Sequence, residues 1–153
     1  MVKIKKAKLE DVSRIRSILT EFVEKQIILD RTEKEISEEL SRFYIAEEED
    51  SITGTVSYHD YGISLKEIRS LVVKTEKQGS GTGRLLVQTA ISDILKSNPE
   101  SKIFTLTYVP EFFKKLNFIE VDKNTLPEKI WKDCNNCVQK DNCGETALIY
   151  NGK

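Results

Sequence analysis

The chain has 153 residues, of which 39% are hydrophobic and 32% are charged, so it is long enough to bury one core. Its 24 Lys and Arg residues nearly balance 25 Asp and Glu residues, which argues against a dedicated nucleic-acid binder because such proteins usually carry a basic excess. No apolar run approaches the length of a membrane span, and the polar N-terminal stretch holds no signal-peptide core. We therefore expect one domain over residues 1–153, located in the cytoplasm.

The spacing of apolar residues predicts an α/β chain. Val2 and Ile4 begin a short strand. Thr32, with Glu35 three residues later, predicts the start of a helix through a capping box. The acidic residues at 47–50 are typical of a turn. The predicted elements are helices over 9–24, 32–41, 85–95 and 111–116 and strands at 2–7, 43–46, 52–58, 65–73, 103–108, 118–121 and 147–150.

Three glycines at alternate positions, 79, 81 and 83, separate a strand from a strongly patterned helix. Glycine lets successive backbone N–H groups turn inward, and the helix start adds free N–H groups and a positive dipole end. This pattern predicts a phosphate or pyrophosphate site, with an ordinary turn as the alternative. A Walker loop is excluded because Arg84 and Leu85 follow the last glycine, and Arg84 also stands where a dinucleotide fingerprint needs its third glycine.

The spacing Gln78-x-x-Gly81-x-Gly83 resembles the acetyl-CoA loop of the GCN5-related N-acetyltransferases (GNAT superfamily). The resemblance implies a GNAT fold, a mixed central sheet with helices on both faces and the acetyl-CoA loop between the fourth strand and the third helix. Further segments are similar to the acetyltransferase domain of N-acetylglutamate synthases, including their short, stand-alone members. These segments are residues 26–32, 43–48, 65–73, 106–118 and 126–134.

The resemblance implies an enzyme that transfers the acetyl group of acetyl-CoA to the α-amine of a free amino acid. Glutamate is the expected acceptor, which would place the reaction at the first step of arginine biosynthesis. Loop N–H groups would hold the pyrophosphate, and main-chain groups before the loop would pair with the pantetheine arm and stabilise the oxyanion. The residues implied to bind the cofactor are Leu71, Val72, Val73, Gln78, Gly79, Ser80, Gly81, Thr82, Gly83 and Arg84.

Glu67 is the candidate for the base that removes the ammonium proton. It lies on the strand that leads to the loop, on the same face as Arg69, and the resemblance places the proposed base of the family there. The alternative is a structural glutamate paired with Arg69. His59, the only histidine, would neighbour Glu67 if the two strands form a hairpin, and it either assists proton removal or is structural.

The acid that would protonate the departing thiolate is not assigned by the sequence. Phe113 and Asn117 stand where many members of the superfamily have the tyrosine and glycine of a Phe-Tyr-x-Lys-Leu-Gly-Phe motif. Because phenylalanine cannot donate a proton, Tyr108 and Ser70 are the remaining candidates for this acid. The alternative is that the thiolate leaves without an acid.

The planar guanidinium group of arginine can bind a carboxylate of an acidic amino acid through two parallel hydrogen bonds. Arg31 matches an arginine of the synthase pattern, and Arg69 and Ser70 lie close to the candidate base in sequence; the alternative for each arginine is a solvated surface charge. Tyr108 stands where the longer synthases have an arginine, so glutamine is a second candidate acceptor. A protein N-terminus, another small amine and a non-catalytic acyl-CoA-sensing module stay as alternatives.

The three cysteines, Cys134, Cys137 and Cys143, lie in a predicted C-terminal loop at about 126–145. A closed zinc site needs a fourth ligand, for which Asp133, Asp141, Glu145 and His59 are candidates. A structural zinc or iron, reduced thiols and a redox pair are all compatible with this spacing. The sequence predicts neither a nucleic-acid nor a membrane partner, and it leaves a monomer and a homodimer open.

Overall fold

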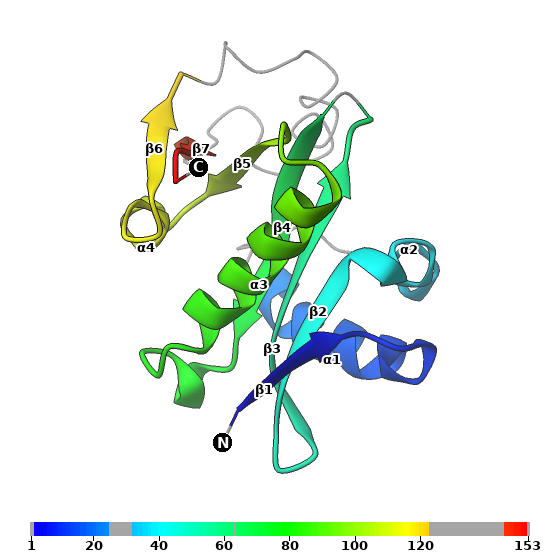
Figure 1. Cartoon of the computed structure of the whole chain (residues 1–153). Coiled ribbons are helices and arrows are strands. Elements are labelled where there is room, and N and C mark those ends of the chain that lie inside the picture. The colour runs from blue at the N-terminus through cyan, green and yellow to red at the C-terminus, as the bar shows by residue number, and fades with distance from the viewer. Residues whose placement is uncertain (1, 25–31, 63, 123–145, 153) are drawn as a thin grey trace. The chain divides into compact units, whose positions relative to one another are not determined.

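The computed structural model describes residues 2–24, 32–62, 64–122 and 146–152, and the chain divides into two compact units, residues 1–103 and 104–153. Figure 1 shows the helices and strands of each unit. The first unit contains β1 (Lys3–Lys6), α1 (Val12–Glu24), α2 (Glu33–Glu38), β2 (Phe43–Glu48), β3 (Ser51–Asp60), β4 (Leu65–Val73) and α3 (Thr82–Ser97). Short 3₁₀ segments, η1 (Leu9–Asp11), η2 (Leu40–Arg42) and η3 (Thr75–Lys77), lie among them. This order confirms the predicted α/β class.

The strands of the first unit form an antiparallel sheet in the order β1, β2, β3, β4. In this ladder Tyr44 of β2 lies opposite Val56 of β3. The β2–β3 register shifts after Ala46, and the β3–β4 register shifts between Thr55 and Ser57. An extra residue in one strand bends it and changes the direction of its side chains. The second shift matters for function because β4 leads into the glycine loop.

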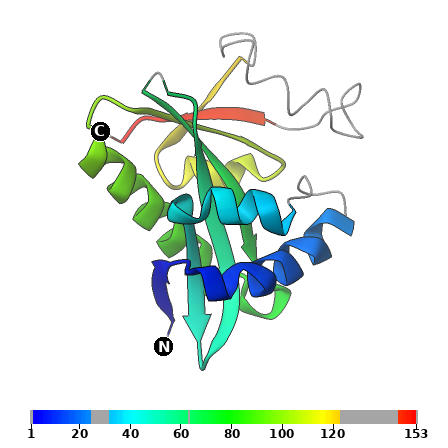
Figure 2. The same cartoon turned by 90° about the vertical axis from the view of Figure 1, so that its right-hand side faces the viewer.

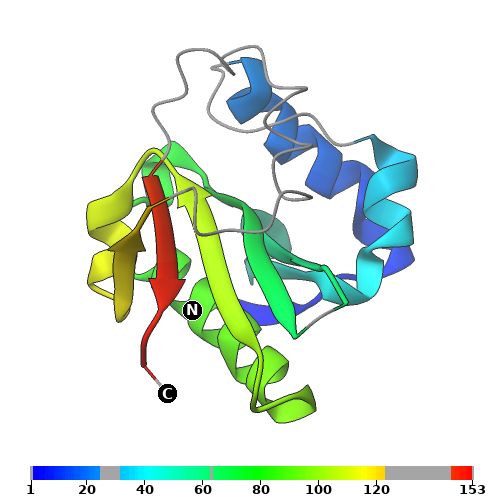
Figure 3. The same cartoon turned by 90° about the horizontal axis from the view of Figure 1, so that it is seen from above.

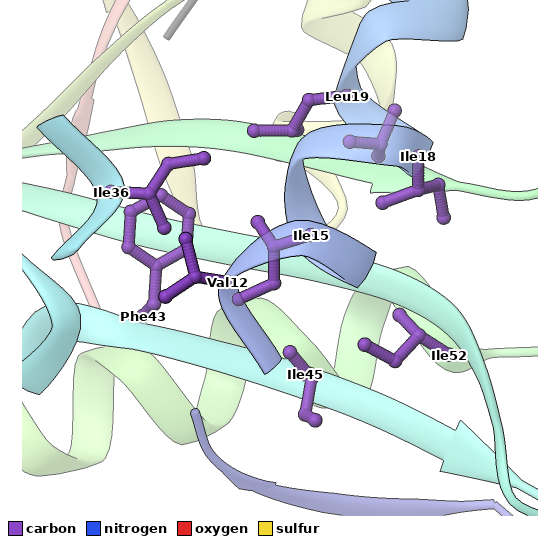
Figure 4. Close-up of a cluster of buried hydrophobic side chains, with 9 residues drawn as sticks. Val12, Ile15, Ile18, Leu19, Ile36, Phe43, Ile45 and Ile52 are labelled. Atoms are coloured by element: carbon purple, nitrogen blue, oxygen red, sulfur yellow. The ribbon is translucent and has the colours of Figure 1, made fainter. Parts of the chain in front are cut away.

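Alternate residues of the central strands face opposite sides of the sheet. Phe43 and Ile45 of β2 lie in the core that α1 and α2 cover, as the close-up in Figure 4 shows. Figures 2 and 3 show these two helices on the side of the strands opposite to α3. Each fully buried aliphatic or aromatic side chain contributes about 1.5–3 kcal/mol. This core consists of Val12, Ile15, Ile18, Leu19, Ile36, Phe43, Ile45, Ile52 and Val72.

α3 packs closely against the other face of the sheet. A Cβ atom at Gly54 of β3 would lie 2.9 Å from the carbonyl oxygen of Val72 and 3.1 Å from Cδ1 of Leu86, so only glycine allows this approach. The Tyr44 hydroxyl donates a hydrogen bond to Asp93 at 2.6 Å. Burial, with this bond as a second cause, raises the pKa of Tyr44. The helix that follows the glycine loop is therefore held to the sheet by packing and by a protonated tyrosine.

α2 begins where the sequence predicts. The Thr32 hydroxyl accepts from the Glu35 backbone N–H at 3.1 Å, and the Glu35 carboxylate accepts from the Thr32 N–H at 3.0 Å, which is the expected capping box. The helix ends at Glu38, before the predicted boundary at 41. It stops there because Glu39 leaves the helical conformation, with φ −107° and ψ 17°, and the chain continues as the 3₁₀ segment η2.

The acidic segment after β2 is only in part the turn that we predicted. β2 continues through Glu48, and the turn consists of Glu49 and Asp50, with φ values of 52° and 65°. Glu47 pairs with Lys5 of β1 at 3.2 Å. The acidic residue therefore lies in the ladder with a cation of the neighbouring strand beside it.

The second unit contains β5 (Lys102–Thr107, which starts at the boundary), α4 (Pro110–Lys114), β6 (Phe118–Val121) and β7 (Thr146–Tyr150). β7 pairs antiparallel with β5 on one side and with β6 on the other. The ring of Phe113 is buried and packs edge-on against Phe118, with 5.2 Å between the ring centroids. Across the described ranges of both units, no helix is long and apolar enough to cross a membrane.

Candidate active site

The glycine loop lies between β4 and α3, as predicted, but α3 begins at Thr82, before the predicted start at 85, so Gly83 belongs to its first turn. Gly79 and Gly81 have positive φ values of 84° and 91°, a conformation that costs residues with a Cβ atom about 1–2 kcal/mol. Gly81 is also the N-cap of α3. The glycines therefore set the path by which the chain enters the helix.

The first turn of α3 presents backbone N–H groups. Its first intrahelical hydrogen bond runs from the Leu85 N–H to the Gly81 carbonyl at 3.1 Å. The N–H groups of Thr82, Gly83 and Arg84 precede it, and such groups have no carbonyl within the helix to bind. The helix dipole adds positive potential at the same place. An anionic group such as a phosphate is the kind of ligand that this arrangement favours.

Side chains of the loop stabilise the loop itself. The Gln78 amide donates a hydrogen bond to the Val73 carbonyl at 3.0 Å, which connects the loop to the end of β4. The Ser80 hydroxyl donates to the Lys77 carbonyl and lies 3.0 Å from the Thr82 hydroxyl. Gln78 and Ser80, both predicted to bind the cofactor, therefore also shape the loop.

A bulge interrupts β4 shortly before the loop. Ser70 and Leu71 are the two residues that the β3–β4 register skips, and Ser70 has a φ of 51°. The Ser70 carbonyl accepts a hydrogen bond from the Thr55 hydroxyl at 2.8 Å, and the Arg69 carbonyl accepts one from the Ser57 hydroxyl at 3.4 Å. Two buried hydroxyls of β3 therefore bond main-chain carbonyls at the bulge.

Glu67 lies on β4 directly opposite His59 of β3, which confirms the predicted hairpin. Its side chain is 9% exposed. Its Oε1 accepts two hydrogen bonds, from the Arg69 Nε and from the Tyr61 hydroxyl, each at 2.8 Å. Within the part of the chain that the structure describes, Oε2 accepts none. One carboxylate oxygen is therefore held, and the other remains to receive a proton.

The ion pair of Glu67 with Arg69, the structural alternative from the sequence, does form. Both side chains are largely buried, at 9% and 12% exposure. Arg69 also donates from Nη2 to the Tyr61 hydroxyl at 2.8 Å. Buried ionisable clusters occur both in structural networks and in active sites, so the pair alone does not separate the two roles. It does place Arg69 against the candidate base.

Tyr61, in the turn between β3 and β4, is a site residue that the sequence pattern did not indicate. Its hydroxyl donates to Glu67 and accepts from Arg69. Burial, with the negative charge of Glu67 as the next cause, raises the pKa of Tyr61, so the hydroxyl keeps its proton. A tyrosine before Gly62 resembles an ordinary turn residue. The sequence signal that could have indicated this contact was the position of Tyr61, six residues before Glu67 in the segment that connects the two strands.

His59 bonds Glu39 at the end of α2 and not Glu67. The His59 Nδ1 lies 2.8 Å from Oε1 of Glu39, and the Arg42 guanidinium lies 3.4 Å from the same oxygen. The hydrogen bond from His59, opposed by burial and assisted by nearby positive charges, lowers the pKa of Glu39. The His59 ring packs edge-on against Tyr61, with centroids 4.5 Å apart. The histidine therefore lies between the Glu67 cluster and α2.

The other predicted site residues belong to the second unit or lie outside the described residues. Tyr108 follows β5 in the second unit and is half-buried. Arg31 is not among the described residues, and neither are the predicted loop at 126–145 and its cysteines, Cys134, Cys137 and Cys143. Where the structure does describe the chain, no group of three or more His, Cys, Asp and Glu side chains could hold a metal ion.

Comparison with known proteins connects this geometry to a family. Residues 5–132 match the family model described as the acetyltransferase (GNAT) domain. An uncharacterised N-acetyltransferase of Chlorobaculum tepidum is 34% identical over 146 residues, which cover 95% of this chain and 94% of that protein. The match to the family therefore extends over most of the chain, including the glycine loop and Glu67.

Two further proteins are similar to this chain over part of their own length. An amino-acid acetyltransferase of Buchnera aphidicola subsp. Schizaphis graminum is 29% identical over 128 residues, which are 82% of this chain and 29% of that protein. The structure of N-acetylglutamate synthase from Neisseria gonorrhoeae, complexed with coenzyme A and N-acetyl-glutamate, has a TM-score of 0.86 at 23% identity. That similarity covers 98% of this chain and 35% of the synthase chain, and it concerns the fold.

Proposed function

This chain belongs to the acetyltransferase (GNAT) domain family and is an acetyl-CoA-dependent N-acetyltransferase with the predicted GNAT fold, and we propose that its acceptor is the α-amine of a free amino acid, first of all L-glutamate. The observation that carries the proposal is Glu67, a buried carboxylate on the strand that enters the cofactor loop, with Oε1 held and Oε2 left to accept a proton. The two amino-acid-acetylating relatives support the class of acceptor.

The proposed reaction is direct transfer in a ternary complex. Glu67 takes one proton from the substrate ammonium, directly or through a water molecule. The amine nitrogen then bonds to the thioester carbonyl carbon. As the carbon–sulfur bond breaks to release the CoA thiolate, the nitrogen gives up its second proton, so that the products are the neutral amide and, after protonation, the CoA thiol. Backbone N–H groups at the bulge and strand end, from Leu71 to Val73, are our candidates to stabilise the oxyanion. Tyr108 is our candidate to protonate the thiolate, with Ser70 as the second.

Holding acetyl-CoA is the proposed task of the loop. The N–H groups of Gly81 to Arg84 would bind the pyrophosphate, and Gln78 would keep the loop joined to β4. Main-chain groups of Leu71 and Val73 would pair with the pantetheine arm. We extend the proposal to a single acetyltransferase domain over residues 1–153, which the family match over residues 5–132 supports, and to a cytoplasmic enzyme. With glutamate as the acceptor, we further propose a role in arginine biosynthesis.

The acceptor carboxylates require cations, for which we propose Arg31 and Arg69. Arg69 already contacts Glu67, so we expect Arg31 to discriminate more strongly between acceptors. An Arg31→Ala variant should raise the KM for glutamate while the KM for acetyl-CoA stays unchanged. If the preferred acceptor is glutamine, the same variant should change the KM less, because a neutral side chain lacks the second carboxylate.

The proposed base is tested by Glu67→Gln, with Glu100→Gln as the matched control at an exposed turn. Loss of a general base typically lowers a rate by 10²–10⁴-fold, so we expect a drop of about that size in kcat with unchanged binding of acetyl-CoA. Glu100→Gln should retain the kcat of the natural enzyme. A Glu67→Gln enzyme with full kcat would contradict the proposed role. Absence of turnover in the natural chain as well as in both variants would favour a sensing module.

A further inference from the structure

Outside the cofactor loop, the described part of the first unit contains one continuous cluster of ionisable side chains around Glu67. Its members come from separate elements: Glu67 and Arg69 from β4, His59 from β3, Tyr61 from the hairpin turn, and Glu39 and Arg42 from the end of α2 and from η2. In the proposed reaction only two members of this cluster have a role, Glu67 as the base and Arg69 as a ligand of the acceptor carboxylates. The reaction gives no role to the remaining members of the cluster, and their contacts connect them to the base.

Tyr61 is the member that joins the two halves of this cluster. Its hydroxyl bonds Glu67 and Arg69 at 2.8 Å each, and its ring contacts His59, which in turn bonds Glu39. The Arg69 guanidinium carbon also lies 5.9 Å from the centroid of the Tyr61 ring. Rotation of the tyrosine is thus restricted from two sides, and its hydroxyl hydrogen is directed at a single oxygen.

Both donors to Glu67 bind the same atom, Oε1. A carboxylate held by two charge-assisted or strongly polarised bonds on one oxygen cannot rotate freely about its last torsion. The second oxygen, Oε2, then has a set direction, and the described residues supply it with no donor. Orientation of a base to within a small angle is worth a large part of its catalytic effect.

We propose that Tyr61 is a positioning residue for the base: together with Arg69 it holds Oε1 of Glu67 so that Oε2 faces the acceptor ammonium. This inference rests on the proposed role of Glu67 as the base. Tyr61 itself neither gives nor takes a proton in the reaction. Burial and the charge of Glu67 disfavour the phenolate form of Tyr61. Its hydroxyl is therefore suited to be a permanent donor and not an acid that must lose its proton in each cycle.

The variant Tyr61→Phe removes only the hydroxyl and keeps the ring contact with His59. We expect kcat to fall by about 3- to 10-fold, the effect of one hydrogen bond, with an unchanged KM for acetyl-CoA. Loss of a donor disfavours the ionised carboxylate, so the acidic limb of the kcat/KM profile should move to higher pH. The matched control is Tyr58→Phe, because Tyr58 lies on β3 opposite Ile68, on the other face of the sheet, and should leave both quantities unchanged.

A double-mutant cycle separates positioning from direct contact with substrate. If Tyr61 acts through Glu67, Tyr61→Phe combined with Glu67→Gln should be no slower than Glu67→Gln alone. Multiplied effects would overturn the proposal, as would a loss of rate in Tyr61→Phe with an unmoved acidic limb. Replacement of Tyr61 by 3-fluorotyrosine keeps the fold and makes the hydroxyl a stronger donor, so it should move the acidic limb to lower pH even if Tyr61→Phe does not fold.

The decisive experiment does not depend on turnover. The carboxyl carbon of Glu67 is followed by ¹³C NMR during a pH titration of the full chain, with Glu67→Gln to assign the signal. We expect its midpoint to rise in Tyr61→Phe and to stay in place in Tyr58→Phe. A midpoint unchanged by Tyr61→Phe overturns the inference whatever the acceptor is. A raised midpoint in a protein that acetylates no amino acid supports the contact and rejects the proposed acceptor instead.

Discussion

The hydroxyl of Thr55 donates a hydrogen bond of 2.8 Å to the carbonyl oxygen of Ser70, the residue with positive φ in the β4 bulge. Thr55 is fully buried. Its hydroxyl therefore bonds a main-chain carbonyl inside the bulge, and a hydrogen bond of this kind contributes about 0.5–1.5 kcal/mol to stability. The bulge in turn determines the direction of the main chain just before the cofactor loop.

We expect Thr55→Val to cost about 0.5–1.5 kcal/mol in the free energy of unfolding, because it removes the hydrogen bond to the Ser70 carbonyl, and to lower kcat as well. Thr53→Val is the control, since Thr53 is also buried on β3 but makes only a 3.4 Å contact with the Ala46 carbonyl. Urea unfolding and steady-state kinetics measure both effects. Equal kcat values for the two variants would show that the bulge does not depend on Thr55.

The left-handed conformation of Gly81 leads to a prediction about the cofactor. Gly81→Ala should destabilise the chain by about 1–2 kcal/mol and weaken the binding of CoA, because the strain acts at the N-cap of α3. Gly62→Ala carries a comparable strain at φ 78° in the β3–β4 turn and should cost similar stability without weakening CoA binding. Calorimetric titration with CoA distinguishes them, and equal affinities would argue against a pyrophosphate site at Gly81.

The depressed pKa of Glu39 predicts an acid-dependent contribution to stability. A carboxyl whose pKa is lowered in the folded state adds stability above its unfolded value, and this stability is lost as the pH falls through the folded value. The ordinary pKa of a glutamate carboxyl is 4.5. Glu39→Gln should therefore lower the Tm at neutral pH, and this decrease in Tm should become progressively smaller below about pH 4.5. Thermal unfolding from about pH 7 to about pH 3 tests this; a Tm difference that is constant over this range would show that the charge of Glu39 adds no stability.

Tyr108 is tested by Tyr108→Phe, with Tyr150→Phe of the same unit as the control. If Tyr108 protonates the CoA thiolate, its variant should lower kcat by about 10²-fold or more, within the usual range for a general acid. The control should keep the rate of the natural enzyme. A Tyr108→Phe enzyme with full kcat would mean that the thiolate leaves without help from this residue, and Ser70 would be tested next.

Local signals in the sequence predicted much of the fold. Thr32 and Glu35 are three residues apart, and their capping box forms as expected. The glycine spacing predicted the loop before α3. His59 was expected to neighbour Glu67 if the two strands form a hairpin, and they do. Each of these features is determined by neighbours in the chain or by a single turn, which is why a pattern of residues is sufficient.

The partners of Glu67 and His59 were harder to predict because they depend on three-dimensional packing. Tyr61 reaches Glu67 only after a bulge-containing hairpin closes, and Glu39 reaches His59 only when α2 lies across β3. The bulge at Ser70 gave no signal either, because a serine with positive φ has no distinctive sequence pattern and is maintained by Thr55. Long-range hydrogen bonds of this kind produce no periodic pattern of residues in the sequence.

The most direct test of the account is to incubate the purified chain with acetyl-CoA and a panel of the twenty amino acids, and to detect acetylated products by mass. Mass detection avoids interference from the three cysteines in a thiol assay. We predict one strongly preferred product, N-acetyl-glutamate, whose formation Glu67→Gln suppresses and Glu100→Gln does not. Preference for glutamine would keep the reaction and revise the acceptor, whereas tight binding of acetyl-CoA with no product from any amino acid would contradict the account.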